Sequence, residues 1–218
     1  MTDKSSPSVG LSPAWIIPVV LVAAMVTGYL WLLQNRDAIP STPSLPELGY
    51  LPEFTGLDQE GKPFRLLDQR GEVLIAKFIF STCPGPCFRM TQEMHGIQEE
   101  LEASEPIRLL SFTVDPEYDR PPILKAYGER MGVDFSRWTL VTGEKDEVYN
   151  LVQNGFKLPL AEVPEGEVIP EDGPIVHSSR FVLVDRAGVI RGYYDGFNAE
   201  QKAELIKAAR HLANSPRS

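Results

Sequence analysis

The two cysteines of the chain, Cys83 and Cys87, lie four positions apart in a turn rich in proline and glycine. The turn follows a nearly continuous apolar run over residues 73–80, which is typical of a β-strand buried on both faces. Apolar residues then recur at helical spacing as far as residue 101, so a helix is predicted there. A chain that uses cysteine only at such a junction is expected to use both sulfurs together. Two chemistries suit the pair: a reversible dithiol/disulfide, or soft-metal binding by two thiolates.

Sequence patterns on either side of this junction predict an α/β domain. They indicate a hairpin over 54–66, a buried strand over 107–114, a helix entered through Pro121-Pro122, a strand over 138–141, a helix capped by Thr142, a loop over 157–176, a hairpin over 181–194 and a helix capped by Asn198. This order favours a central mixed sheet with helices on both faces. A cysteine pair between the first buried strand and the next helix makes the predicted fold thioredoxin-like.

The stretch 14–33 contains no charged residue. Twenty helical residues span about 30 Å, the thickness of the hydrocarbon core of a bilayer. Trp15 and the Tyr29/Trp31 pair stand near its two ends, where amphipathic rings prefer to lie. The alternative is a cleaved signal peptide, which lacks support because Lys4 is offset by Asp3 and no small-x-small cleavage site follows closely. We therefore expect a retained transmembrane helix.

These patterns divide the chain into four parts. A short tail (1–13) precedes the anchor (14–33), a proline-rich linker (34–46) follows it, and the thioredoxin-like domain occupies 47–214. The short N-terminus and the cysteine pair favour a domain outside the cytoplasm, where disulfides persist. The expected location is the inner membrane, single-pass, with the domain on the periplasmic side.

The net charge of −9 belongs to residues 45–218, because the first 44 residues carry two acids and two bases. An acidic domain without a lysine or arginine cluster cannot replace the counterions of a phosphate backbone. Nucleic acid is therefore not an expected partner.

A third ligand would distinguish a metal site from a simple dithiol. If the helix begins near Pro86, Cys87 lies in its first turn, where the helix dipole favours a thiolate. His177 follows the acidic loop and opens a predicted strand, a junction that this fold brings beside the cysteine turn. Two thiolates and one imidazole suit Cu(I), so His177 is the candidate third ligand. His95 and His211 are interpreted as ordinary helix residues.

Four other side chains near the cysteines admit two interpretations. Met90 and Met94 could add soft ligands, but both continue the apolar stripe of their helix and are expected in the core. Asp115 and Asp119 could serve the site or lie in a solvated turn.

Several motifs together resemble the Sco/SenC family of thioredoxin-like copper proteins. They are the Cys83/Cys87 turn, the segment Ser111-Phe-Thr-Val-Asp-Pro-Glu-Tyr-Asp119, the segment Trp138-Thr-Leu-Val-Thr-Gly143 and the His177-Ser178 pair, all in the family's order over about residues 47–212. A single N-terminal anchor is also typical of the family. The chain departs from the family pattern at Phe88, where a proline is usual, and at Val176, where an acid is usual.

The resemblance implies that Cys83, Cys87 and His177 bind copper, as Cu(I) or Cu(II), and that the reduced dithiol can also exchange with disulfides. With Val176 in place of the usual acid, the partner that orients His177 could be Asp172 or the 115–119 segment. The implied function is a copper metallochaperone for the binuclear copper centre of cytochrome c oxidase, with the copper-bearing oxidase subunit as partner. The alternatives are a metal-free thiol–disulfide oxidoreductase, which would be an enzyme, and a copper or redox sensor.

Overall fold

The computed structural model describes residues 16–34, 45–83, 85–164, 167–168 and 174–215, and it divides into two compact units, Met1–Ser44 and Leu45–Ser218. The described residues of the first unit form helix α1 (Ile16–Gln34), on which large apolar side chains such as Met25 and Tyr29 are exposed. Across the described ranges, no helix has both the length and the apolar character needed to cross a membrane. The anchor at 14–33 therefore stays a prediction, and the tail 1–13 and most of the linker lie outside the described residues.

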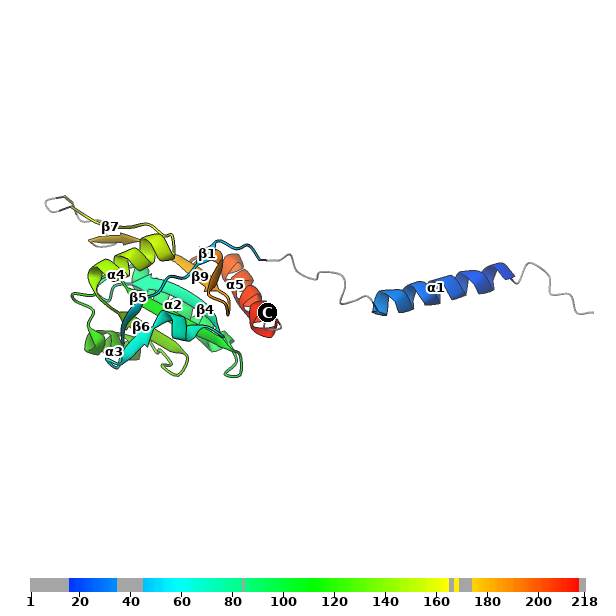
Figure 1. Ribbon diagram of the computed structural model, residues 1–218, viewed down its shortest axis with the longest axis horizontal. Helices are drawn as coiled ribbons and strands as arrows, with labels where there is room; N and C mark the ends of the chain where they lie inside the picture. The colour runs from blue at the N-terminus through cyan, green and yellow to red at the C-terminus, as the bar shows by residue number, and fades with distance from the viewer. Residues whose placement is uncertain (1–15, 35–44, 84, 165–166, 169–173, 216–218) are drawn as a thin grey trace, which may run out of the picture. The chain divides into compact units, whose positions relative to one another are not determined.

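The second unit is built on an eight-stranded mixed sheet (Figure 1). Its spatial order is β1 (Gly49–Tyr50), β10 (Val189–Asp195), β9 (Arg180–Val184), β4 (Val73–Ile79), β5 (Ile107–Thr113), β6 (Trp138–Thr142), β2 (Thr55–Asp58) and β3 (Pro63–Arg65). Strands β4, β5 and β6 are parallel, and the other neighbouring strands pair antiparallel. Every residue of β4 is buried, as expected of a strand covered on both faces.

Helices cover both faces of the sheet. On one face, α2 (Pro86–Glu100), α3 (Pro121–Arg130) and α5 (Ala199–Asn214) contribute to a core that includes Ile75 and Ile79 of β4. On the other face, α4 (Lys145–Asn150) and the π-helical turn that follows it (Leu151–Gly155) pack near Ala76 and Phe78. The predicted α/β class and the two-sided arrangement are confirmed.

The strand pairing explains why distant parts of the chain meet at one edge of the sheet. Strand β4 pairs antiparallel with β9, with Ala76 opposite Val182, so the end of β4 lies beside the start of β9. Strand β5 runs parallel to β4 and ends at the same edge. The cysteine turn, the loop after β5 and the residues before β9 therefore gather together.

Two local expectations were wrong. Residues 157–176 are not simply a loop, because β7 (Leu160–Glu162) and β8 (Ile175–His177) form a separate antiparallel pair within and beside them. Thr142 ends β6 rather than capping a helix, and α4 begins at Lys145 with no side-chain hydrogen bond at its N-cap. By contrast, Asn198 caps α5 as predicted and accepts hydrogen bonds from two backbone N–H groups.

Candidate metal and dithiol site

The two cysteines lie at the start of α2. Gly85 is the N-cap and Pro86 the first helical residue, which places Cys87 in the first turn as the sequence predicted. Both cysteines are thiols; Cys87 is fully buried and Cys83 is half-buried. The backbone N–H of Cys87 points at the Cys83 sulfur, with N and Sγ 3.4 Å apart. One helix start therefore holds both sulfurs, one of them within reach of solvent.

His177 is the last residue of β8, just before β9, and its side chain faces this helix start. Its Nε2 lies 2.9 Å from Cys87 Sγ, and its Nδ1 lies 3.1 Å from the backbone oxygen of Ser178. A carbonyl oxygen can only accept a hydrogen bond, so Nδ1 carries the proton. The lone pair of Nε2 is then directed at Cys87. The rings of Phe80 and His177 pack edge to face, with their centroids 5.7 Å apart.

The structure thus brings Cys87 directly against His177 and keeps Cys83 beside Cys87. Within the described parts of the chain, no group of three or more His, Cys, Asp or Glu side chains is arranged as a metal site. The donors themselves suit a soft monovalent ion such as Cu(I), which accepts thiolates and imidazole at low coordination number. A three-ligand site stays a prediction, and the same two sulfurs also suit dithiol chemistry.

Among the described residues, the group that orients His177 is one that sequence patterns do not single out. The carbonyl of Ser178 takes that role, through a backbone bond that sequence patterns do not signal. Asp172 lies outside the described residues. Asp119 is fully buried and accepts hydrogen bonds from Ser81 N at 2.9 Å, from Ser81 Oγ, and from Thr113 Oγ1 at 2.6 Å. Asp119 therefore ties the residues before the cysteine turn to the end of β5, and it is not in a solvated turn.

The protonation of Cys87 also differs from the prediction. The side chain of Cys83 hydrogen-bonds to Cys87, and this contact, followed by burial, raises the pKa of the Cys87 thiol above its usual range. A backbone hydrogen bond involving Phe80 and the positive charge of Lys77 act in the opposite direction. Without a metal, Cys87 is a thiol, because the helix dipole does not overcome the contact with Cys83.

Sequence patterns also missed Lys77, the one charged residue within the apolar run of β4. Its side chain is fully buried, and burial lowers the pKa of Lys77 to about 7, while the charge of Cys87 acts to raise it. The only available signal was a lysine in a strand predicted to be buried on both faces. Such a residue is expensive to bury, which marks it as a candidate for a role at the site.

The remaining candidates lie where the sequence placed them. Met90 and Met94 are buried in the core on the α2 face of the sheet, which confirms the core interpretation. His211 lies in the last turn of α5. The two positions that depart from the family pattern are exposed apolar residues beside the site, Phe88 at 48% and Val176 at 52% exposure.

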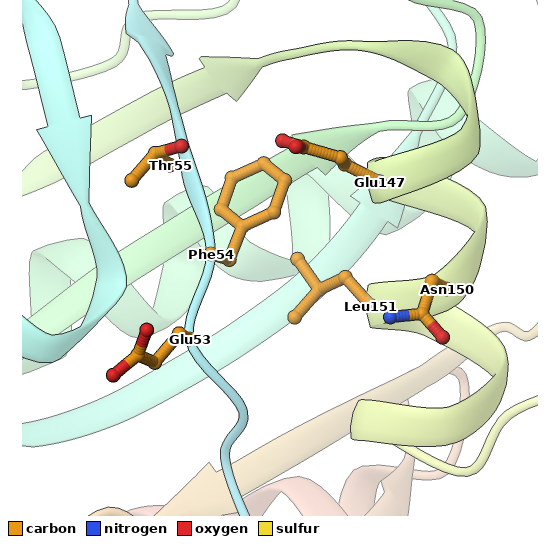
Figure 2. A pocket seen from close by; sticks show the side chains of 6 residues that line it. All are labelled: Glu53, Phe54, Thr55, Glu147, Asn150 and Leu151. Atoms are coloured by element: carbon orange, nitrogen blue, oxygen red, sulfur yellow. The ribbon is translucent and has the colours of Figure 1, made fainter.

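A separate cavity of about 300 Å³ lies between the segment leading into β2 and the helix α4 with the turn that follows it. Glu53, Phe54 and Thr55 line it from the strand side, and Glu147, Asn150 and Leu151 line it from the helix (Figure 2). None of the residues that line it is a cysteine or histidine. The cavity is therefore not part of the thiol site.

Comparison with known proteins agrees with the fold. The family described as SCO1/SenC matches residues 45–214. The SCO1 protein homolog of Bacillus subtilis is 35% identical over 155 residues, which cover 70% of this chain and 77% of that protein.

Two solved structures have the same fold. One is of BsSco, described as a Sco family cytochrome c oxidase assembly protein with a disulfide switch; it has a TM-score of 0.68 and 30% identity, covering 80% of this chain and 100% of that one. The other, yeast Sco1 with copper bound, has a TM-score of 0.59 and 24% identity, covering 79% of this chain and 92% of that one, and shows the fold alone. With a family match across the whole sheet domain and a relative of this similarity, the chain belongs to the SCO1/SenC family.

Proposed function

We propose that this chain is a membrane-anchored copper metallochaperone. It takes up copper on Cys83, Cys87 and His177 and delivers it to the binuclear copper centre of cytochrome c oxidase. The copper-bearing oxidase subunit is the partner. The domain works on the periplasmic side of the inner membrane, held there by the uncharged stretch at 14–33.

The observation that carries this proposal is the 2.9 Å separation between Cys87 Sγ and His177 Nε2. Metal binding would replace the S–H···N contact between them, and the Nδ1–H bond to Ser178 fixes the tautomer that a metal requires. Cys83, being half-buried, is the ligand that an acceptor protein can reach first. Copper can then pass to the acceptor by stepwise exchange of ligands. Membership of the SCO1/SenC family, which includes a copper-bound yeast Sco1 structure, supports the choice of metal.

A second function, thiol–disulfide exchange, is favoured by the position of the two sulfurs at one helix start. The Cys83 thiolate would attack a partner's disulfide to form a mixed disulfide and release one partner thiolate. Cys87 would then attack Cys83's sulfur, closing the Cys83–Cys87 disulfide and releasing the second partner thiol. Two electrons pass from this chain to the partner. A copper or redox sensor would use the same residues and differ only in its output.

The test is an anaerobic Cu(I) titration of the purified protein and of His177→Ala, in competition with a Cu(I) chelator. Wild type should bind one Cu(I) per chain. Replacing a residue that only orients a metal ligand weakens metal affinity about 10- to 100-fold. His177 is itself a proposed ligand, so the variant should lose at least that much Cu(I) affinity. Disulfide formation between Cys83 and Cys87 should remain.

The matched control is His211→Ala, which removes an imidazole at the far end of α5 and should leave Cu(I) affinity unchanged. Equal affinity in wild type and His177→Ala would contradict the metallochaperone. If both proteins then reduce a disulfide substrate at the same rate without copper, the oxidoreductase explanation replaces it.

A further inference from the structure

The buried Lys77 side chain hydrogen-bonds to a hydroxyl on α2, the helix that begins at the cysteine turn. The Nζ of Lys77 donates a hydrogen bond to Oγ1 of Thr91, and the same hydroxyl lies 2.8 Å from the backbone oxygen of Cys87. The hydroxyl of Tyr127 lies 2.7 Å from Thr91 Oγ1. Because the Thr91 proton goes to the Cys87 carbonyl, Lys77 and Tyr127 must both donate to the threonine oxygen. Every bonding position of this hydroxyl is filled, so the Lys77 nitrogen is fixed in place.

Among the described residues, Lys77 forms no ion pair with a carboxylate, and its Nζ lies 5.5 Å from the centroid of the Trp138 ring. Within the described structure, Cys87 is the ionisable group whose negative charge acts on Lys77. A buried ammonium without a counter-ion lowers the stability of a fold. The natural counter-ion is a negative charge that arises on the sulfurs when the site is loaded.

The charge of a loaded site depends on the oxidation state of the metal. Two thiolates and a neutral imidazole give a net charge of −1 with Cu(I) and zero with Cu(II). A fixed positive charge nearby attracts the first complex and leaves the second nearly unaffected.

We propose that Lys77 is a specificity-determining residue that makes the Cys83/Cys87/His177 site prefer Cu(I) over Cu(II). Lys77 does not touch the metal and acts through its charge, which balances the negative Cu(I) dithiolate. The inference rests on the proposed copper site, and it assigns the oxidation state of the cargo. It also explains why the central strand keeps a charge that an apolar residue could replace.

The experiment compares Lys77→Met with wild type in the full-length protein. Cu(I) affinity is measured by competition with a chelator, and the Cu(II)/Cu(I) midpoint potential of the loaded site is measured by anaerobic redox titration. Lys77→Met should bind Cu(I) about tenfold or more weakly, with Cu(II) affinity changed less than about threefold. A tenfold loss of selectivity corresponds to a midpoint potential lower by about 59 mV. Metal-free Lys77→Met should melt at the same temperature as wild type or higher, since a polar group that is costly to bury has gone.

Two further variants separate charge from packing. Lys77→Gln keeps a donor for Thr91 but has no charge, and it should lose the Cu(I) preference as Lys77→Met does. Ile75→Met changes packing on the same face of β4 and should keep the preference. Three results would contradict the proposal: Cu(I) and Cu(II) affinities that fall together in Lys77→Met, affinities that do not change, or a Lys77→Gln variant that behaves as wild type. Absence of Cu(I) binding by wild type would instead remove the proposed function, and this inference with it.

Discussion

Lys77 and Cys87 are buried ionisable groups, and in the metal-free protein the pKa of each is shifted toward its uncharged form. The pKa of Lys77 is lowered to about 7 by burial, and the pKa of the Cys87 thiol is raised, first by its contact with Cys83 and then by burial. Both shifts reduce charge in the interior, so the empty site favours an amine and a thiol. Metal binding at the proposed site would reverse this preference by removing the thiol proton. The empty and loaded proteins would then differ in charge at two buried positions.

The lowered pKa of Lys77 predicts that stability depends on pH. Between pH 7 and 9 the unfolded lysine, with its pKa near 10.5, stays protonated while the folded one loses its proton. The unfolded state then binds more protons, so the free energy of unfolding rises with pH, by about 1.4 kcal/mol for each unit fully traversed. Urea unfolding of the reduced, metal-free protein at pH 7, 8 and 9 should show this rise.

Lys77→Met should abolish that rise, and an equal slope in the variant would contradict it. Above about pH 9 the rise in wild type should level off. An unfolded cysteine loses its proton near its ordinary pKa of 9.0 while the folded Cys87 keeps it, and this difference lowers the free energy of unfolding as pH increases.

At this scale, sequence reasoning identified all three proposed ligands but not their surroundings. Cys83 and Cys87 were recognisable from their spacing and the strand–helix junction, and His177 from its place before a strand. Lys77 and Asp119 were not, because their roles depend on which neighbours the sheet brings to them. The same holds for Ser178, which acts through its backbone, and backbone carbonyls leave no mark in a sequence.

Among the elements, the cysteine turn depends on its attachment to the loop after β5. Asp119 makes that attachment through Ser81 and Thr113 while fully buried. Asp119→Ala would leave these three donor groups without their acceptor and should lower the free energy of unfolding by about 3 kcal/mol. Copper affinity should fall as well, because the turn that carries Cys83 loses its support.

Asp115→Ala is the matched control for this prediction. Asp115 lies in the same loop, and in the described structure its carboxylate accepts one long contact, from Tyr118 N at 3.4 Å. Its loss should cost less than about 1 kcal/mol. Urea unfolding of both variants measures the difference, and equal stabilities would show that Asp119 does not secure the turn.

Most elements were predictable because each has a long local signal. The buried strands β4 and β5, the hairpin of β9 and β10 and the start of α5 follow from apolar runs, turn residues and the Asn198 cap. Strands β7 and β8 have three residues each, too few to establish an alternating pattern. Thr142 was misassigned because a threonine before acidic residues fits an N-cap equally well as a strand end.

For the whole molecule, the proposed anchor decides how the domain is held at a membrane. It is the uncharged stretch 14–33, most of which forms α1 with exposed apolar side chains. The full chain expressed in a bacterium should pellet with membranes and resist extraction by alkaline carbonate. A chain that begins at Leu45 should remain in the supernatant, and recovery of the full chain there would contradict the anchor.

Protease added to intact spheroplasts should digest the domain if it faces the periplasm.

The long chain segment between Cys87 and His177, which the pairing of β4 with β9 brings together, has a consequence for the lifetime of the copper-loaded protein. Cys87 and His177 are ninety residues apart in the chain, so a metal held between them acts as a reversible cross-link that closes a long loop. Such closure removes entropy from the unfolded chain and stabilises whatever it encloses. Loaded molecules should therefore outlast empty ones wherever proteases sample opened chains, and surrendering the cargo would also surrender that protection. Degradation would then act mainly on spent copies.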